Sequence, residues 1–400
     1  MSVAASLVAW PLLFVVLDTS AQMVSRLREV VLEYRTDCSD FQVLVPIYGS
    51  VAYLENVPFL AGYGSRVTLC TTSSESETFR TQLQALCHTY GFTVFEGDVG
   101  RRSVTSTKRA TSGTVRDRVI HDALPHVTAE YVVCLDADTA SVLPLGRLVG
   151  RMQEQDLDLA SVRLVPTNDE GPLGKLQRHE YRTAMMLRRI MPWMVSGACH
   201  VARTAALRDI MARHSLFFQG NDVEVGILGE RLGYRVGHVP FDVQTTVPVS
   251  WRAWFRQRVA WAGGEVRLFL VNPQLVLRHP VLWLYGGGVS LLCAPFRWVS
   301  VVGGGWVLAV VLGANVAIEL RLHRRHRDRW LLVLPFYLAF ASLVLTPLGL
   351  WSYVVMAVRH RNAGLIRVGR RRGSVGVPGR RRLASEAMCE PAAARHPNGA

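Results

Sequence analysis

The stretch YVVCLDADT, Tyr131–Thr139, decides the fold, because an apolar run leads directly into two carboxylates, Asp136 and Asp138. A short apolar run bounded by turn residues is typical of a strand buried in a sheet. With a tight turn at Ala137, both carboxylates can approach one divalent cation. Carboxylate oxygens suit Mg²⁺ or Mn²⁺, which also bind substrate phosphates. A D-x-D alone is common in surface turns, but the preceding buried strand favours a metal site at its carboxyl end.

On both sides of this stretch, from Phe41 to about Asn272, short β-rich runs alternate with polar, helix-like stretches. Strands that alternate with helices predict an α/β domain with crossover units and a mainly parallel sheet. Ligands of such sheets bind beyond the carboxyl ends of the strands. The expected strands are Gln42–Pro46, Arg66–Cys70, Thr93–Phe95, Tyr131–Leu135 and Leu159–Leu164, and the clearest helices are Glu77–Tyr90 and Thr114–Ala123.

The composition excludes a disordered chain, since 50% of the 400 residues are hydrophobic and only 19% are charged. The formal net charge of +14 would suit nucleic acid, but most of it lies in Arg321–Arg329 and Arg359–Arg382, beside apolar runs. Basic residues in that position favour anchoring at the cytoplasmic membrane face. We therefore expect membrane lipids as partners and no nucleic acid. The cysteines are scattered without a C-x-x-C pair, which predicts reduced thiols.

Apolar segments flank the α/β region on both sides. The predicted division is an N-terminal membrane segment at 1–20, a catalytic domain at 41–272, transmembrane helices at 275–358 and a basic, disordered tail at 359–400. A cleaved signal peptide is the alternative for the first segment. Val281–Phe296 and Trp298–Leu320 could form two spans, and Trp330–Val358 is expected to bend or re-enter near Pro347. The predicted location is the cell membrane, multi-pass, with a cytoplasmic catalytic domain.

Two further clusters carry polar residues that could be functional. Gly220–Glu224, GNDVE, opens a helix-like stretch, for which helix capping is the simple alternative. Trp251–Trp261 is typical of an amphipathic helix near a membrane, where Trp and Arg often serve as interfacial anchors. Each cluster taken alone favours its structural interpretation.

The order of the motifs changes that interpretation. Asp136-Ala-Asp138 is followed by Gln177-Arg-His-Glu180-Tyr181, Ser196-Gly197-Ala198, Asn221-Asp222 and Gln257-Arg258-x-x-Trp261, all ahead of the apolar segments. This series resembles the membrane-embedded family-2 glycosyltransferases, which include hyaluronan, chitin and cellulose synthases. The resemblance implies a GT-A fold, which binds a nucleotide sugar, fused to transmembrane helices. It also implies inverting, metal-dependent transfer of a hexosyl or N-acetylhexosaminyl group from a nucleotide sugar, expected to be a UDP-sugar, to a saccharide acceptor in polysaccharide biosynthesis.

The resemblance further implies roles for single residues. Asp136 and Asp138 match the D-x-D that holds the metal and the diphosphate, and Asp222 matches the acid that deprotonates the acceptor hydroxyl. The residues expected to bind the donor are Pro46, Tyr48, Thr71, Thr72, Lys108, Asp136, Gln257, Arg258 and Trp261. The residues expected to bind the acceptor are Glu180, Tyr181, Ser196, Gly197, Ala198 and Trp261.

The sequence departs from the family's pattern at three places. Thr71 and Thr72 stand where the family has an Asp pair, although their hydroxyls can still hydrogen-bond a nucleotide. Asn221 replaces the Glu of the "ED" motif. Ala260 replaces the Arg of QxxRW, so that Arg258 or Arg256 supplies the charge or the diphosphate is held differently. Lys108, after the third strand, is a further cation that could contact the diphosphate; a simple surface role is the alternative.

Two alternatives follow from these departures. One is single-step transfer to a lipid acceptor such as polyprenyl phosphate or a glycolipid, without chain growth. Another is a catalytically degenerate membrane scaffold, against which the retention of Asp136, Asp138 and Asp222 argues. A pore for polymer export would need a partner, for which a homodimer is the simplest arrangement.

Overall fold

The computed structural model describes residues 23–24, 34–97, 112–216, 220–272, 298, 306–323 and 326–359. These residues form an eight-stranded sheet in the order β3-β2-β1-β4-β7-β6-β8-β5. The strands are β1 (Phe41–Pro46), β2 (Val67–Thr72), β3 (Thr93–Gly97), β4 (Tyr131–Leu135), β5 (Ala140–Ser141), β6 (Leu159–Pro166), β7 (Cys199–Arg203) and β8 (Val236–Thr245). The main helices are α3 (Glu77–Tyr90), α5 (Ser112–Ala123), α6 (Leu145–Glu154), α7 (Gly171–Leu187), α8 (Thr204–Ala212), α9 (Asn221–Leu232), α10 (Trp251–Val271), α14 (Trp306–Leu322), α15 (Trp330–Phe340) and α16 (Thr346–Arg359).

The sheet is mixed. The parallel pairing expected from the sequence is present in β3-β2-β1-β4 and between β6 and β8. By contrast, β7 runs antiparallel to β4 and β6, and β5 runs antiparallel to β8. The reason lies in the segment after α7, which reaches the sheet at the carboxyl end of β4, where Cys199 pairs with Leu135. A strand that begins beside the carboxyl end of β4 must run antiparallel to β4. The five predicted strands and both predicted helices are confirmed, with ends shifted by no more than two residues.

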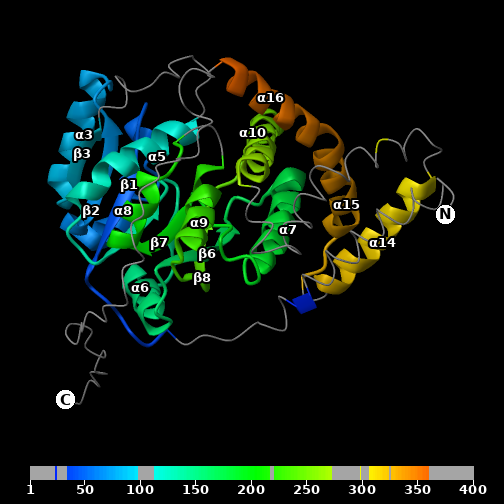
Figure 1. Cartoon of the computed structure of the whole chain (residues 1–400), viewed down its shortest axis with the longest axis horizontal. Helices are drawn as coiled ribbons and strands as arrows, with labels where there is room; N and C mark the ends of the chain where they lie inside the picture. The colour runs from blue at the N-terminus through cyan, green and yellow to red at the C-terminus, as the bar shows by residue number, and fades with distance from the viewer. Residues whose placement is uncertain are drawn as a thin grey trace.

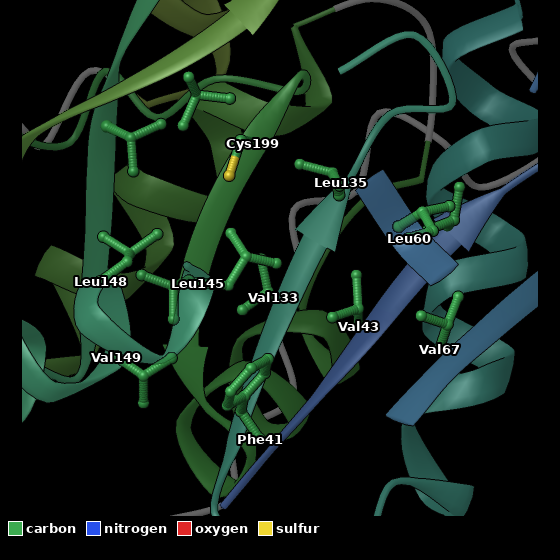
Figure 2. Packing of buried hydrophobic residues seen from close by; sticks show 14 of the residues in the cluster. Phe41, Val43, Leu60, Val67, Val133, Leu135, Leu145, Leu148, Val149 and Cys199 are labelled. Carbon is green, nitrogen blue, oxygen red and sulfur yellow. The ribbon is translucent and has the colours of Figure 1, made fainter. Parts of the chain in front are cut away.

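Helices cover both faces of the sheet (Figure 1), because successive strand residues point to opposite sides. In β1, Val43 and Val45 join one core with α3 and α6, whereas Leu44 joins a second core with α5, α8 and α9. Figure 2 shows Val43 and Val133, from neighbouring strands, in the first core together with Leu145 of α6. Among the described cysteines, Cys38, Cys70, Cys87, Cys134 and Cys199 are buried and free, as the spacing predicted.

Two helices of the α/β domain, α7 and α10, pack against the C-terminal helices (Figure 1). Leu173 and Leu176 of α7 and Trp254 of α10 share a buried cluster with Leu331 and Leu334 of α15. The contact between α16 and α10 is closer still, because the backbones meet at Gly349 with no room for a side chain. A Cβ at this glycine would lie only 2.5 Å from the backbone nitrogen of Gly263. The C-terminal helices are therefore joined to the wall of the α/β domain.

The stretch Trp330–Val358 stays helical throughout, so the re-entrant hairpin expected near Pro347 is not found. A π-helical turn, Ala341–Leu345, precedes α16, and the helix continues past Pro347 without a break. Pro347 cannot donate to the carbonyl four residues earlier, that of Leu343. The Trp298 indole N–H donates to this carbonyl instead, at 2.9 Å.

Trp330–Val358 is also the one helix in the described part of the chain that is long and apolar enough to cross a membrane. That assignment rests on length and composition alone, and a buried core helix would pass the same test. The expected N-terminal segment, 1–20, and the whole of Val281–Phe296 lie outside the described residues, as does the tail beyond Arg359.

Candidate active site

A cavity of about 970 Å³ opens at the carboxyl ends of β1 and β4 and is closed by residues of α7, α9 and α10. This is where an α/β sheet is expected to hold its ligand. Most of the residues proposed from the sequence line it: Pro46, Tyr48, Asp136, Asp138, Glu180, Tyr181, Ser196, Gly197, Ala198, Asp222, Gln257 and Trp261. Motifs spread over more than 200 residues of chain thus converge on one space.

The D-x-D turn at the end of β4 is held from outside the motif. Asn56, which is buried, donates from Nδ2 to the carbonyl oxygens of Asp136 (3.1 Å) and Thr139 (2.6 Å). The backbone N–H groups of Glu55 and Asn56 both donate to the carbonyl of Ala137. These bonds fix the turn that the sequence predicted at Ala137. Asn56 itself was not predicted, because its contribution depends on a contact across 80 residues.

The two carboxylates of the motif have different surroundings. Asp136 accepts from Nε of Arg116 at 2.7 Å, and Arg116 also pairs with Asp117. Burial lowers the pKa of Arg116, but Asp136 and Asp117 outweigh it and hold that pKa above its ordinary value. Asp138 instead accepts from two hydroxyls, Thr139 Oγ1 at 3.0 Å and Thr246 Oγ1 at 2.5 Å. The charge of Asp136 is therefore neutralised by a neighbour, whereas that of Asp138 is not.

This arrangement fits a cation that prefers oxygen ligands. No group of three or more His, Cys, Asp or Glu side chains that could hold a metal is found within the described ranges. Mg²⁺ and similar ions do not require such a group, because one or two carboxylates, waters and substrate phosphates complete their shell. Asp138 is the carboxylate best placed to hold such an ion, with Asp136 beside it in the same turn.

Asp222 also lines the cavity, and it lies in the first turn of α9. The N-cap of this helix is Gly220, at φ +83°, so neither Asn221 nor Asp222 is the capping residue. Asp222 Oδ2 accepts from the backbone N–H of Gly197 at 2.7 Å. The Gly197 carbonyl in turn accepts from Arg116. A continuous set of contacts, Asp136–Arg116–Gly197–Asp222, thus joins the D-x-D turn to the candidate base.

The first turn of α9 is fixed in place by buried charge. Glu224 pairs with Arg267 of α10, and both side chains are almost completely buried. Burial raises the pKa of Glu224, but His214 and Arg267 outweigh it, and the net pKa lies below its ordinary value. The helix also lies directly against the preceding loop, since a Cβ at Gly226 would come 1.9 Å from the Trp193 carbonyl oxygen. These contacts determine where Asp222 lies.

Arg258 does not line the cavity. It is buried, and it binds both carboxylate oxygens of Glu180, with Nη2–Oε2 at 2.7 Å and Nε–Oε1 at 3.0 Å. Its Nη1 donates to Gln257 Oε1 at 2.6 Å, and its guanidinium lies over the Trp261 ring at 4.2 Å. The Tyr337 hydroxyl of α15 donates to Glu180 at 2.6 Å. In this structure Arg258 connects α7, α10 and α15 and holds cavity-lining residues in position.

Two other residues proposed for donor binding are not brought into the cavity. Thr71 and Thr72 end β2 in buried positions outside its lining. Thr72 Oγ1 donates to Glu75 at 3.1 Å, and Glu75 accepts from the Gly49 N–H at 3.1 Å. Lys108 lies outside the described residues. Two cavity-lining arginines, Arg116 and Arg188, could not be predicted from the sequence, because neither stands in a recognisable motif.

The chain is similar to a known protein family and to several solved structures. Residues 131–360 match the family described as glycosyl transferase family group 2. A search of curated proteins gives no match. Among solved structures, the mannosyltransferase PcManGT from Pyrobaculum calidifontis, in complex with GDP-Man and Mn²⁺, is 15% identical, with a TM-score of 0.48 over 89% of this chain and 99% of that one.

Two further solved structures are similar at lower scores. TarS of S. aureus (residues 1–349) is 14% identical, with a TM-score of 0.38 over 79% of this chain and 91% of that one. Glucosyl-3-phosphoglycerate synthase from Mycobacterium tuberculosis, in complex with Mn²⁺, UDP and phosphoglyceric acid, is 17% identical, with a TM-score of 0.34 over 56% and 76%.

The matched segment begins at β4, the strand that carries the D-x-D motif, and it includes Asp222 and the helices that close the cavity. It spans more than half of the 400 residues. The mixed α/β sheet is consistent with the GT-A fold that the sequence implied. The chain belongs to glycosyl transferase family group 2.

Proposed function

We propose that this protein is an inverting, metal-dependent glycosyltransferase that moves a sugar from a nucleotide-sugar donor to an acceptor hydroxyl at a membrane surface. The observation that carries the proposal is the convergence of Asp136, Asp138 and Asp222 on one cavity, with Arg116 and Gly197 connecting them. Separate capping or surface roles would not require the three carboxylates to face the same space.

The donor is assigned to the side of the cavity formed by β1 and the D-x-D turn. Pro46 and Tyr48 follow β1 and line this side. When the anomeric C–O bond breaks, the diphosphate leaves with the bonding electron pair and negative charge grows on its oxygens. Asp138 would hold a divalent ion there, which when bound would supply opposing charge. Arg116 keeps the Asp136 carboxylate oriented and limits its repulsion of the phosphates.

The acceptor is assigned to the side formed by α7, α9 and the loop Ser196–Ala198. A general base must lie within hydrogen-bond reach of the hydroxyl that it deprotonates. Asp222 is the candidate, since it faces the cavity and the Gly197 N–H fixes one of its oxygens, leaving the other to accept a proton. A single displacement opposite the leaving diphosphate inverts the anomeric centre.

The membrane part of the proposal rests on α15 and α16. Their outer surface exposes large apolar side chains, including Phe336 (56% exposed) and Trp351 (67% exposed). The inner side of α16 packs on α10, whose residues Gln257 and Trp261 line the cavity. A membrane bound at that outer surface would bring lipids close to the cavity. We propose that the protein acts at that membrane surface. The donor that it turns over defines the sugar and the base of the nucleotide, and the acceptor that it uses defines the extent of chain growth.

The direct test is the release of nucleoside diphosphate by purified protein in detergent, across a panel of UDP- and GDP-sugars with Mn²⁺, Mg²⁺ or EDTA. We expect one donor to be turned over, only with metal, and not by Asp138→Ala. Product size then distinguishes a polymer from a single transfer. Absence of turnover across the panel, with saccharide and lipid acceptors supplied, would refute the proposal in favour of a degenerate scaffold.

A further inference from the structure

A polar cluster lies outside the cavity, where α7 meets the C-terminal helices. His179 Nε2 contacts Asp328 Oδ2, in the loop that precedes α15, at 2.9 Å. One helical turn further along the same face of α7, Thr183 Oγ1 contacts Nε2 of His323, the residue that follows α14, at 3.3 Å. The two histidine rings lie edge to face, with their centroids 5.5 Å apart. The cluster therefore joins α7 both to the end of α14 and to the start of α15.

The contact with Asp328 sets the tautomer of the neutral His179 ring. An ionised carboxylate only accepts hydrogen bonds, so Nε2 carries the hydrogen and Nδ1 carries the lone pair. The Nδ1 atom is buried and has no hydrogen-bond partner among the described residues. A protonated ring would have a second N–H at Nδ1, with no acceptor there to receive it. The surroundings of His179 thus fit the neutral ring and not the cation.

The groups that surround His179 favour the same form. The side chain is fully buried, and burial lowers its pKa. His323 and Arg182 lower this pKa further, whereas Asp328 raises it and is outweighed. Glu319 of α14 lies 3.1 Å from His323 Nε2 and acts on His179 only through that ring. Because the folded pKa lies below the value of about 6.5 for an unfolded histidine, His179 resists protonation while the junction is intact.

The residue that follows His179 on α7 belongs to the cavity. Glu180 lines it and accepts from the Tyr337 hydroxyl of α15 at 2.6 Å and from Arg258 of α10. The segment from Asp328 through α15 is therefore attached to α7 by polar contacts at two adjacent positions, one outside the cavity and one at its lining. The rest of the contact between α7 and α15 is apolar. Loss of the outer contact would free the start of α15, which carries the hydroxyl that holds Glu180.

We propose that His179 is a positioning residue that holds α15 against α7 only while its ring is neutral, so that acid loosens this junction and lowers turnover at the neighbouring cavity. A proton taken up at Nδ1 places a cation beside His323 and Arg182, and this is relieved when the loop before α15 moves away and water reaches the ring. Above about pH 6.5 the ring is neutral in both the attached and the released state. Below that pH the released state binds more protons, and the attachment weakens by up to about tenfold per pH unit. Only the effect on turnover rests on the proposed function.

The experiment measures amide hydrogen exchange of the full-length protein in detergent between pH 7.5 and 5.5, corrected for the intrinsic exchange rate. In wild type we expect the protection of residues 328–334 to fall by up to about tenfold per pH unit below pH 6.5. His179→Gln keeps a donor for Asp328 but takes up no proton, so its protection should stay constant over this range. Asp328→Asn keeps an acceptor for Nε2 but removes the charge that favours the imidazolium, so it should lose more protection in acid than wild type. Once a donor is known, the ratio of kcat at pH 5.5 to kcat at pH 7.5 should be higher in His179→Gln than in wild type.

His88→Gln is the matched control, because His88 lies on the exposed face of α3, and it should leave the pH dependence of residues 328–334 unchanged. Equal pH dependence in wild type and His179→Gln would overturn the inference. Protection that is already lost at pH 7.5 in His179→Gln, and falls no less steeply in acid, would overturn it by indicating a purely structural role. Equal kcat ratios would overturn the link to the cavity while leaving the proposed function intact. A wild-type protein inactive with every donor would refute the function itself, and the exchange measurements would still decide whether His179 controls the junction.

Discussion

Asp222 accepts a hydrogen bond from the backbone N–H of Gly197 at 2.7 Å. The bond joins the start of α9 to the loop before β7, two segments that the sequence linked only by their order. It occupies one carboxylate oxygen, and so sets the orientation of the other.

Asp222→Asn should abolish transfer without unfolding the site. The amide oxygen of Asn can still accept from Gly197, but the side chain no longer takes up a proton. We expect the rate to fall about 100- to 10,000-fold, the usual contribution of a general base. Nucleotide affinity, measured by isothermal titration with the nucleoside diphosphate, should stay within about twofold of wild type. A variant with more than half of the wild-type rate would show that another group is the base.

Asp138→Ala and Asp136→Ala should differ in their response to metal. Because Asp136 is paired with Arg116, the ion should depend chiefly on Asp138. Asp138→Ala is expected to reduce nucleotide affinity in Mn²⁺ to the value that wild type shows in EDTA. Thr246→Ala, which removes only a hydrogen bond to Asp138, is the milder control. If metal dependence persisted in Asp138→Ala and vanished in Asp136→Ala, the two assignments would have to be exchanged.

Arg258→Ala should destabilise the fold as well as reduce activity. It leaves Glu180 without its bidentate partner in a largely buried position. Breaking a buried pair by removing one partner typically costs about 3 kcal/mol of unfolding free energy. The exposed Arg256 provides the control, and Arg256→Ala should change stability by about 0.5 kcal/mol or less. Denaturant titrations of both variants measure the difference, and equal stabilities would contradict a structural role for Arg258.

Gly349→Ala should weaken the attachment of α16 to α10. The new methyl group would lie 2.5 Å from the Gly263 nitrogen and 2.8 Å from the Ala262 Cβ, so the helices would have to separate. We expect a loss of about 1–3 kcal/mol, as for other overpacked contacts. Gly313→Ala, in α14, meets nothing within 4 Å and should be neutral or slightly stabilising. Thermal unfolding in detergent compares the two, and matching melting temperatures would refute the close contact.

Stability should fall in acid because of His200. Burial, with the charge of Arg116, lowers the pKa of His200 to about 3, whereas an unfolded histidine titrates near 6.5. Between those values the unfolded state binds more protons, so this contribution is complete above about pH 6.5 and is lost as the pH falls. The slope approaches about 1.4 kcal/mol per pH unit.

His200→Gln keeps a donor for the Ser196 carbonyl, which His200 Nδ1 contacts at 3.0 Å, and removes the titration. We expect its unfolding free energy to vary less steeply than that of wild type between pH 6.5 and 4. The check is a set of urea titrations across that range for both proteins. Parallel pH profiles would mean that His200 is not held neutral in the folded state.

Five of the eight strands, β1, β2, β3, β4 and β6, were predictable from the sequence because each is a short, β-rich run between polar, helix-like stretches. The antiparallel direction of β7 was not predictable, because it depends on where the chain re-enters the sheet. The continuity of Trp330–Val358 was also missed. The sequence shows Pro347 but not Trp298, which supplies the hydrogen bond that the proline cannot make.

The residues of the candidate site divide in the same way. Asp136 and Asp138 could be picked out because two carboxylates directly after an apolar strand form a local pattern, whereas Asp222 was assigned only through the order of motifs that resembles the family. Arg116 and Asn56 could not, because the residues of the site that they contact, Asp136 and Gly197 for Arg116 and Asp136 and Thr139 for Asn56, lie far from them in the chain. For Arg258 the residue type indicated a phosphate contact, and only the fold showed that Glu180 occupies the guanidinium.

The sequence by itself determined the α/β class, the order of the motifs and the two carboxylates of the D-x-D, because local periodicity and residue chemistry suffice for these. The tertiary structure decided that Asp222 faces the same cavity, and that Arg116 and Arg188 line it whereas Arg258 is paired with Glu180 outside it. Charge pairing and burial are properties of side chains that meet in space, and such meetings are not encoded at any single position of the chain.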